Sequence, residues 1–402
     1  MNVPEIRFKR FSGEWDAAHL KDVSTYSNGG SFENDVKAEG RYELVTLKSV
    51  DMKGNLVSSG RYIDIEVPTL PKDTLVMILS EQSPGLLGMT ARIPVGEKYV
   101  LNQRVAEIRP LKNIESYFLS MVVNRNQRYF SERGAGTKVQ NISKQNVENY
   151  EFLIPRKEEQ TQIGNTFQKL DSLINQHQQK HDKLSSIKKA MLEKMFPKQG
   201  ETTPEIRFKG FSGEWEKSSL FEEAVVSTGF PFDSADFSDS GDLLVITNGN
   251  IQNSSSAVDG KVGNRIASEK VTSLSQHILN VGDILVTMDG SVGRTAKVID
   301  SSQILAQRVG RLVAKNNTEF LYQSLNTGAF LDAMTTISHG GTIKHISLTE
   351  IGSYMLLVPK NIEEQEKIGS YLQTLDALIY QHQQQITKLN NIKQACLSKM
   401  FV

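Results

Sequence analysis

Hydrophobic residues recur at alternating steps of four and three along two long segments of the chain. The first segment lies between Pro155 and Pro197, and the second follows Pro359 and contains no further proline. This spacing is typical of the narrow apolar seam of a coiled coil rather than of a broad globular face. We therefore predict two helices of roughly 37 residues, each about 55 Å long. The predicted seam residues, which would pair the helices and help to dock partners, are Ile163, Phe167, Leu170, Ile174, His177 and Leu184, then Ile368, Leu372, Leu375, Ile379, His382 and Leu389.

The two predicted helices resemble each other, so the simplest arrangement pairs them with each other in antiparallel fashion. Pairing with a second molecule is the alternative. His177 and His382 lie on the seam within identical Gln-His-Gln-Gln tetrads. They could join His181 in a metal site, but a polar layer that fixes the register of the helices is the simpler interpretation. Ile386 stands where a fourth histidine would complete a symmetric site, and we predict no metal.

The segment before each helix contains many short candidate strands, such as Leu75–Leu79 and Ile284–Thr287, and has the pattern of a mixed α/β domain. The predicted fold is α+β, with two mixed α/β head domains separated by two long helices that form an antiparallel coiled coil. The internal repeat would be pseudo-twofold. The predicted boundaries are a first head at 1–154, a first helix with its linker at 155–200, a second head at 201–358 and a second helix at 359–402.

Short motifs are repeated between the two halves of the chain. Pro4–Trp15 and Pro204–Trp215 match at eleven of twelve positions, and a Glu-Glu-Gln-x-x-Ile-Gly sequence opens both predicted helices. We expect the Phe and Trp residues of the first motif to anchor each head on the helix ends. The heads themselves share only a few short motifs; in one of them, Gly136-Thr137 corresponds to Gly341-Thr342. Two heads with one fold and different surfaces are typical of a protein that binds two different targets.

Composition narrows the possible classes of protein. The chain of 402 residues has 46 basic and 46 acidic residues, which counts against a general electrostatic binder of nucleic acid but not against a protein with locally clustered cations. A single cysteine, Cys396, excludes an internal disulfide and fits a reducing compartment. We find no apolar run of ~20 residues and no signal peptide. These features predict a cytoplasmic protein that does not contact a membrane.

Motifs for catalysis are missing from the sequence. It contains no phosphate-binding loop with its lysine, no His-Glu-x-x-His metal motif, no Gly-x-Ser-x-Gly nucleophile turn and no Asn-Pro-Pro-Tyr/Phe tetrad of amino-methylating enzymes. The glycines at 289–293 follow a strand but are better explained as a hairpin turn. We therefore expect a binding protein without catalytic residues.

Contacts to DNA require donors for phosphates and planar polar groups for base edges. Such residues cluster in loops at similar places in both heads, although each alone could be an ordinary solvated residue. The repeated Gln103-Arg104 and Gln307-Arg308 pairs we interpret as structural, with the arginine bound to loop carbonyls. The candidates for DNA contact are Lys48, Ser80, Glu81, Gln82, Arg92, Lys138, Gln140 and Asn141 in the first head, and Asn248, Asn250, Asp289, Arg294, Thr342, Lys344 and His345 in the second.

Taken together, these motifs resemble the specificity (S) subunit of type I restriction–modification systems over essentially the whole chain. The resemblance rests on the Arg-Phe-x-x-Phe-x-Gly-Glu-Trp motif at 7–15 and 207–215, on Gly229-Phe230-Pro231-Phe232, and on the Glu-Gln-x-x-Ile opening of both helices. Asp283-Ile284-Leu285 and Gln307-Arg308-Val309 add to it. The first head departs from the pattern, because Ser27-Asn28-Gly29-Gly30 stands where Gly-Phe-Pro-Phe is expected.

The resemblance implies that each head recognises one half of a bipartite, asymmetric double-stranded DNA sequence. It implies that the helices set the length of the unread spacer and bind two modification subunits, which methylate adenine with S-adenosylmethionine. Two restriction subunits would use ATP and Mg²⁺, while this chain would hold no cofactor. Deleting 171–177 and 376–382 should then change the spacer alone. The alternatives are a coiled-coil scaffold with two protein-binding heads, for which zero net charge is the best support, and an enzyme with an unrecognised site.

Overall fold

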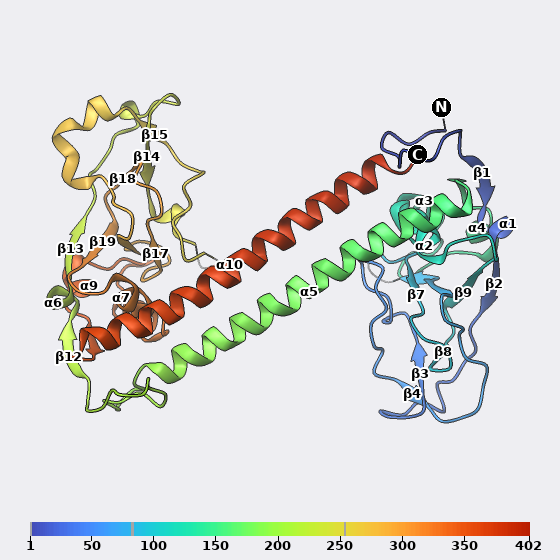
Figure 1. The fold of residues 1–402 in the computed structure, drawn as a ribbon, viewed down its shortest axis with the longest axis horizontal. Coiled ribbons are helices and arrows are strands. Elements are labelled where there is room, and N and C mark those ends of the chain that lie inside the picture. The colour runs from blue at the N-terminus through green and yellow to red at the C-terminus, as the bar shows by residue number, and fades with distance from the viewer. Residues whose placement is uncertain (1, 82–83, 253–254) are drawn as a thin grey trace. The chain divides into compact units, whose positions relative to one another are not determined.

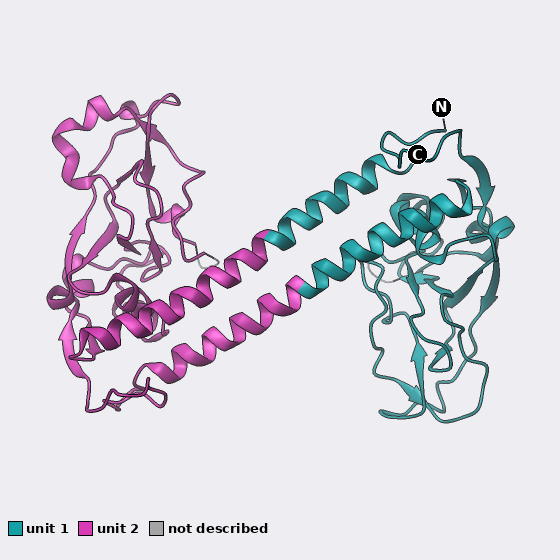
Figure 2. Cartoon of the chain, viewed as in Figure 1, with its two compact units in different colours: residues 1–176, 385–402 teal, residues 177–384 magenta. Residues whose placement is uncertain are grey.

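The computed structural model describes residues 2–81, 84–252 and 255–402. It divides into two compact units, which are shown in separate colours in Figure 2. Unit 1 comprises residues 1–176 and 385–402, and unit 2 comprises residues 177–384. Each unit therefore contains one head and a part of both long helices. Among the helices that the structure describes, none has the length and apolar character needed to cross a bilayer.

The two long helices are α5 (Lys157–Met195) and α10 (Ile362–Lys399), which appear green and red in Figure 1. In unit 1 the first turns of α5 lie beside the last turns of α10, where Lys393 Nζ is 2.6 Å from Asp171 Oδ1. In unit 2 the end of α5 lies beside the start of α10, where Lys188 Nζ is 2.6 Å from Asp376 Oδ1. The predicted antiparallel pairing is thus confirmed within each unit.

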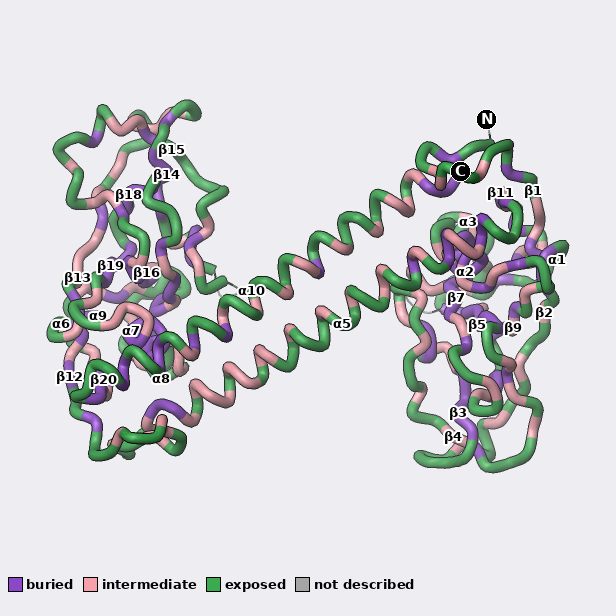
Figure 3. Tube along the Cα trace, viewed as in Figure 1, coloured by how far each residue is buried: buried purple, intermediate pink, exposed green. Residues whose placement is uncertain are grey.

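The apolar seam follows the predicted steps of four and three. Ile163 and Phe167 are buried in the core of unit 1, and Ile368, Leu372 and Leu375 are buried in the core of unit 2. Figure 3 shows how burial along both helices falls away from the heads. The remaining seam residues are Leu170 and Leu184, which pack on the cores, and Ile174, Ile379 and Leu389, which are half-buried.

The two seam histidines meet across the helix pair of unit 2. His177 Nδ1 and His382 Nδ1 are 2.8 Å apart, which is the geometry of a polar layer. His181 Nδ1 lies 3.0 Å from Asp182 Oδ1 on its own helix, so it does not complete a three-histidine site. Within the described ranges, no cluster of three His, Cys, Asp or Glu side chains has the geometry to hold a metal ion.

The head of unit 1 is built on a four-stranded antiparallel sheet in the order β2-β9-β5-β7. Its central strand, β5 (Leu75–Ile78), is buried throughout because its side chains alternate between two cores: Leu75 and Met77 face one, and Val76 and Ile78 face the other. The other elements are β1 (Asp16–His19), α1 (Leu20–Val23), β2 (Ser24–Asn28), β3 (Tyr42–Val45), β4 (Tyr62–Ile63), β6 (Ser80–Glu81), β7 (Thr90–Arg92), β8 (Tyr99–Leu101), β9 (Val105–Pro110), α2 (Ser116–Arg125), α3 (Gln127–Glu132), β10 (Gln140–Asn141), α4 (Lys144–Glu148) and β11 (Glu151–Ile154).

The head of unit 2 repeats this topology. Its four-stranded sheet has the order β13-β19-β16-β17, and its three-stranded sheet β15-β14-β18 corresponds to β4-β3-β8 of unit 1. The predicted α+β class and the shared fold of the heads are confirmed. The elements are β12 (Glu216–Ser219), α6 (Leu220–Glu223), β13 (Ala224–Thr228), η1 (Ser234–Asp236), β14 (Leu243–Ile246), η2 (Asn248–Asn250), β15 (Arg265–Ile266), η3 (Ser268–His277), β16 (Ile284–Thr287), β17 (Thr295–Lys297), β18 (Gln303–Leu305), β19 (Val309–Ala314), α7 (Thr318–Leu325), α8 (Ala329–Ile337), α9 (Leu348–Gly352) and β20 (Met355–Val358).

The repeated Arg-Phe…Trp motif joins each head to the helix ends. Trp15 is buried edge-on against Phe118 of α2 and Phe401, at ring-centroid distances of 5.9 and 6.3 Å. Trp215 occupies the same position against Phe196 and Phe320 in unit 2, at 5.9 and 5.7 Å. The predicted anchoring role is therefore confirmed for the tryptophans.

The arginine of the motif forms a second link that the sequence did not reveal. The Arg7 guanidinium donates two hydrogen bonds of 2.7 Å to the buried carboxylate of Glu159, and a third to the carbonyl of Gly13. Arg207 binds Glu364 in the same bidentate way, at 2.7 and 2.8 Å. The repeated Glu-Glu-Gln helix opening is explained by this contact, because its second glutamate receives the arginine.

Candidate nucleic-acid interface

Three loops meet at the same place in each head. In unit 1, β6 pairs with β10, so that Ser80 lies opposite Asn141. In unit 2, Asp289 lies opposite His345. The third loop is a turn in which the Arg104 carbonyl accepts a hydrogen bond from the Leu79 amide in unit 1. In unit 2 the Arg308 carbonyl accepts the equivalent bond from the Met288 amide. We call these residues the loop cluster; it comprises 80–81, 103–104 and 135–141 in unit 1, and 289–290, 307–308 and 339–345 in unit 2.

A glycine in a left-handed conformation shapes the longest loop of each cluster. Gly136 and Gly340 have φ angles of +125° and +107°. A Cβ atom would lie 2.1 Å from the Val139 oxygen in unit 1 and 2.4 Å from the Ile343 oxygen in unit 2, so only glycine fits. Gly136 therefore corresponds to Gly340, and the sequence-based match with Gly341 is wrong by one residue.

In unit 2 the loop cluster holds a set of charged side chains. Asp289 Oδ1 is 2.5 Å from His345 Nδ1, and Asp289 Oδ2 accepts a hydrogen bond of 2.9 Å from Arg308 Nη1. Partial burial opposes ionisation of Asp289, but the bonds from His345 and Arg308 prevail and lower its pKa. Asp289 is therefore a carboxylate at neutral pH that holds the other two side chains in place.

Two neighbours extend the unit 2 cluster. Asn248 accepts a hydrogen bond of 3.3 Å from the Met288 amide through its Oδ1, which places it beside Asp289. Thr342 and Lys344 are exposed on the glycine loop, and the Lys344 carbonyl accepts from the Gly290 amide at 2.8 Å. The structure thus brings five of the predicted residues of this head together: Asn248, Asp289, Thr342, Lys344 and His345.

In unit 1 the positions that correspond to Asp289 and His345 carry the neutral residues Ser80 and Asn141. Lys138 and Asn141 are exposed and Gln140 is half-buried. Ser80 is only 2% exposed, and the buried Glu81 accepts from the Leu86 and Leu87 amides. Ser80 and Glu81 therefore shape the loop from within, which corrects their prediction as DNA contacts. Gln82 lies outside the described residues.

Asn250 also has a structural role instead of the predicted one. Its side chain is 4% exposed, and its amide bonds the Thr247 amide and the carbonyls of Asp259 and Val262. Ser49 closes the equivalent turn of unit 1 through its hydroxyl. All polar groups of Asn250 are used to hold this turn. Lys48 is exposed on the unit 1 turn and is free to contact a partner.

The two predicted arginines of the sheet edge differ in their surroundings. Arg92 pairs with Asp73 at 3.3 Å and lies over the Tyr117 ring at 5.3 Å. Lys297 lies over Tyr322 in the same way in unit 2. Arg92 is therefore part of a contact that is repeated between the heads, and its role in DNA contact stays a prediction. Arg294 precedes β17 and is half-exposed, with no side-chain hydrogen bond or ion pair to any described residue.

Arg104 and Arg308 were interpreted as ligands of loop carbonyls, and the structure does not support this. Arg308 is 64% exposed and bonds the Asp289 carboxylate. Arg104 is exposed, and the described residues offer its side chain no hydrogen bond. Repetition of Gln-Arg between otherwise divergent heads was the signal that could have placed these residues among the candidates.

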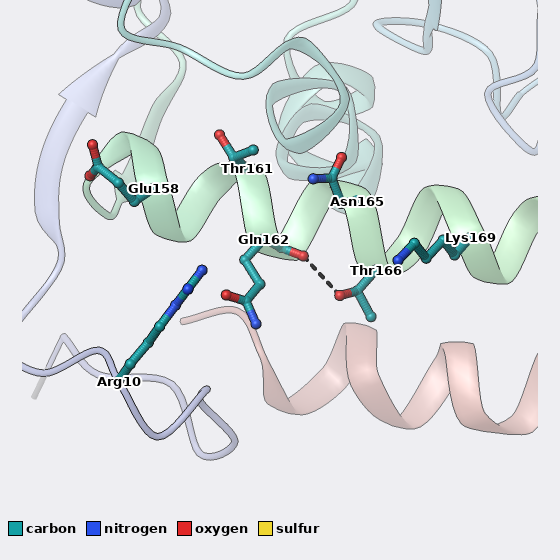
Figure 4. Close-up of a pocket in the computed structure, with 7 residues that line it drawn as sticks. All are labelled: Arg10, Glu158, Thr161, Gln162, Asn165, Thr166 and Lys169. Atoms are coloured by element: carbon teal, nitrogen blue, oxygen red, sulfur yellow. Dashed lines mark hydrogen bonds between the residues drawn. The ribbon is translucent and has the colours of Figure 1, made fainter.

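A hollow of about 280 Å³ lies beside the first turns of α5, between the helix and Arg10 (Figure 4). Small-molecule sites are lined mainly by apolar side chains, whereas this lining is hydrophilic. None of the predicted DNA-contact residues belongs to it. The lining residues are Arg10, Glu158, Thr161, Gln162, Asn165, Thr166 and Lys169.

Comparison with known proteins identifies one relative that matches nearly the whole chain and another that matches about half of it. The chain is 21% identical over 394 residues to the type I restriction enzyme MjaVIII specificity subunit of Methanocaldococcus jannaschii, which covers 94% of this chain and 90% of the relative. It is 23% identical over 211 residues to the putative type I restriction enzyme MjaX specificity subunit of the same organism, 49% of each chain. In fold it matches the crystal structure of the type I restriction–modification S subunit from M. genitalium, with a TM-score of 0.65, 16% identity and coverage of 100% and 99%.

The family model for the type I restriction modification DNA specificity domain matches twice, at residues 12–186 and 212–391. The two matches cover both heads and most of both helices, in agreement with the internal repeat. They support recognition of DNA and do not favour the scaffold. The chain therefore belongs to the type I restriction–modification DNA specificity family, whose members are non-catalytic subunits that recognise DNA sequence.

Proposed function

We propose that this chain recognises a bipartite, asymmetric sequence in double-stranded DNA, with the head of each unit bound to one half-site. The observation that carries the proposal is the loop cluster. The same backbone arrangement presents an amide at Asn141 in unit 1 and an imidazole held by a carboxylate at His345 in unit 2. Recognition of two different half-sites requires different side chains at equivalent positions of the same fold.

The exposed side chains of each cluster are suited to base edges. An asparagine amide pairs with adenine in the major groove, and other polar groups discriminate bases by their donor and acceptor patterns. Exposed Lys138 and Lys344 add positive charge to the two loops, which favours the phosphate backbone. In this proposal the lysines position the DNA and the neighbouring polar residues recognise its sequence.

The partners in this proposal are two modification subunits and two restriction subunits. The names of the relatives, which are type I restriction enzyme specificity subunits, support such an assembly. The ion pairs Arg7–Glu159 and Arg207–Glu364 hold the first turn of a long helix in the same way in each unit. The exposed faces of α5 and α10 would provide docking surfaces for these partners. S-adenosylmethionine, ATP and Mg²⁺ would be bound by these partners, in the cytoplasm where they meet DNA.

A methylation map tests the proposal. The chain is expressed with its modification subunit in a host that lacks adenine methylation, and native DNA is sequenced. We expect a split, asymmetric motif with one methylated adenine on each strand, which disappears when this chain is omitted. Unchanged methylation, with the modification subunit shown to be present and bound to this chain, would overturn the proposal.

A further inference from the structure

The turn that carries the repeated Gln-Arg pair has an unusual backbone in both heads. Arg104 and Arg308 have φ angles of +64° and +68°, in the left-handed region that residues other than glycine rarely adopt. Among the described residues, only two others that are not glycine share this feature: Asp73 and Glu97. A strained conformation that recurs at equivalent positions is held by the surrounding structure and is often tied to function.

The surrounding structure fixes each turn firmly. The Arg104 carbonyl accepts a hydrogen bond of 3.1 Å from the Leu79 amide, and the Arg308 carbonyl accepts one of 3.3 Å from the Met288 amide. The following residues, Val105 and Val309, are fully buried. Each arginine Cα is thus locked at the edge of its loop cluster, next to the residues that differ between the heads.

A structural role for the arginine side chains does not explain this arrangement. Arg7 shows what a structural arginine looks like in this protein, because it is largely buried and bonds both a carboxylate and a carbonyl. Arg104 and Arg308 are exposed instead. Glycine would also form the left-handed turn with less strain, so the turn itself does not require an arginine.

We propose that Arg104 and Arg308 bind the phosphate backbone of the DNA, one in each half-site. The inference rests on the proposed function. The two half-sites of an asymmetric target differ in their bases but share the phosphodiester backbone. The side chains that differ between the clusters, Asn141 and His345, suit the bases, whereas the identical arginine suits the part of DNA that is the same in both. A guanidinium binds phosphate oxygens with paired N–H donors.

In unit 2 the Asp289 carboxylate orients the guanidinium. It binds Nη1 of Arg308 and leaves the remaining N–H groups of the five in a guanidinium available. In unit 1 the position of Asp289 is taken by the neutral, buried Ser80. All N–H groups of the Arg104 guanidinium are therefore available for phosphate. The two phosphate contacts therefore share a backbone position and differ in how the side chain is held.

The test uses the full complex of this chain with its modification subunits, bound to DNA that carries the mapped motif. The variants are Arg104→Gly and Arg308→Gly, with Arg308→Lys to retain charge. Glu97→Gly is the matched control, because Glu97 is exposed and has a φ of +60°. DNA affinity is measured by fluorescence anisotropy over a series of salt concentrations. Melting temperature and the methylation map are recorded for each variant.

We expect each Arg→Gly variant to melt at or above the wild-type temperature, because glycine relieves the left-handed strain, and to bind DNA roughly tenfold more weakly. The slope of log affinity against log salt should fall by about one, uniformly across sequences. The methylated motif should stay the same, Arg308→Lys should restore the slope, and Glu97→Gly should change neither affinity nor slope.

Other results would overturn the inference in distinct ways. A lower melting temperature for the Arg→Gly variants but not for Glu97→Gly would assign the arginines a structural role. A methylated motif that differs from the wild-type motif at one base of one half-site would assign the arginines to base recognition. Wild-type affinity and slope would show that they do not contact DNA. Failure of the wild-type complex to bind or methylate DNA would instead refute the proposed function.

Discussion

At the scale of single residues, the two arginine–glutamate clamps are buried ion pairs that join each repeated motif to the start of a long helix. Glu159 is 2% exposed and Arg7 is 13% exposed. Removal of the arginine would leave a buried carboxylate without a partner, and loss of one member of such a pair commonly costs 3–5 kcal/mol, or about 3 kcal/mol here because the arginine is partly exposed.

We therefore expect Arg7→Ala to lower the free energy of unfolding of unit 1 by about 3 kcal/mol. Urea unfolding measures the change. Arg128→Ala is the matched control, because its ion pair with Glu132 lies on the exposed surface of α3, where solvent screens the attraction and the pair contributes little to stability. Equal losses in the two variants would contradict the role assigned to the clamp.

The histidine layer of the helix seam predicts a dependence of stability on pH. Burial, and then the charges of His177, Lys180 and His181, lower the pKa of His382. The unfolded chain takes up this proton near pH 6.5, whereas the folded helix pair takes it up only at lower pH. This contribution to stability is therefore complete above about pH 6.5 and is lost as the pH falls toward the folded pKa.

We expect His382→Leu to reduce the fall in melting temperature between pH 7.5 and pH 5.5. His19→Gln serves as a control outside the helix seam, since His19 is half-buried at the end of β1 in unit 1. The same acid sensitivity in His382→Leu as in the wild type would contradict the lowered pKa of His382.

At the scale of elements, the helices are stable because they are packed on the heads. Phe167 of α5 is fully buried in the core of unit 1, whereas Leu173, less than two turns further along the same helix, is 43% exposed. We expect Phe167→Ala to cost about 3–5 kcal/mol and Leu173→Ala to stay within about 0.5 kcal/mol of the wild type. Calorimetry on both variants would reveal the difference; similar costs would contradict the claim that packing on the head stabilises α5.

At the scale of the whole molecule, α5 and α10 each run without interruption through both units. The deletion of 171–177 and 376–382 would also remove Asp171 and Asp376, which bind lysines of the opposite helix. Deletion of 174–180 and 379–385 avoids this loss and keeps the seam in phase, since a full heptad is removed from both helices.

Each helix would then be shorter by ~10.5 Å. We expect the methylation map to show the same two half-sites with fewer unread base pairs between them, by at most about three at ~3.4 Å per step. The single-helix deletion of 174–180, which puts the helices out of register, is the control and should abolish methylation. Altered half-sites with an unchanged spacer would refute the role of the helices as a spacer.

The sequence alone determined the features that depend on periodicity and repetition. The steps of four and three predicted both helices and most of the seam, because a helix places such residues on one face whatever surrounds it. The likeness of the two helices favoured their antiparallel pairing. Repetition predicted two heads of one fold, and the Trp15 and Trp215 anchors followed from it.

Only the tertiary structure decided which polar residues are available to a ligand. Asn250 and Ser80 have side chains of a kind that can contact DNA, but hydrogen bonds and packing from other segments bury them. Arg104 and Arg308 were interpreted as structural because the Gln-Arg pair is repeated in otherwise divergent heads, whereas their left-handed backbone and exposed side chains leave no mark in the local sequence. The residues that bury a side chain or form hydrogen bonds with it are far apart along the chain. For that reason only the folded structure distinguishes the exposed residues of the loop cluster from the buried residues that hold the loops in place.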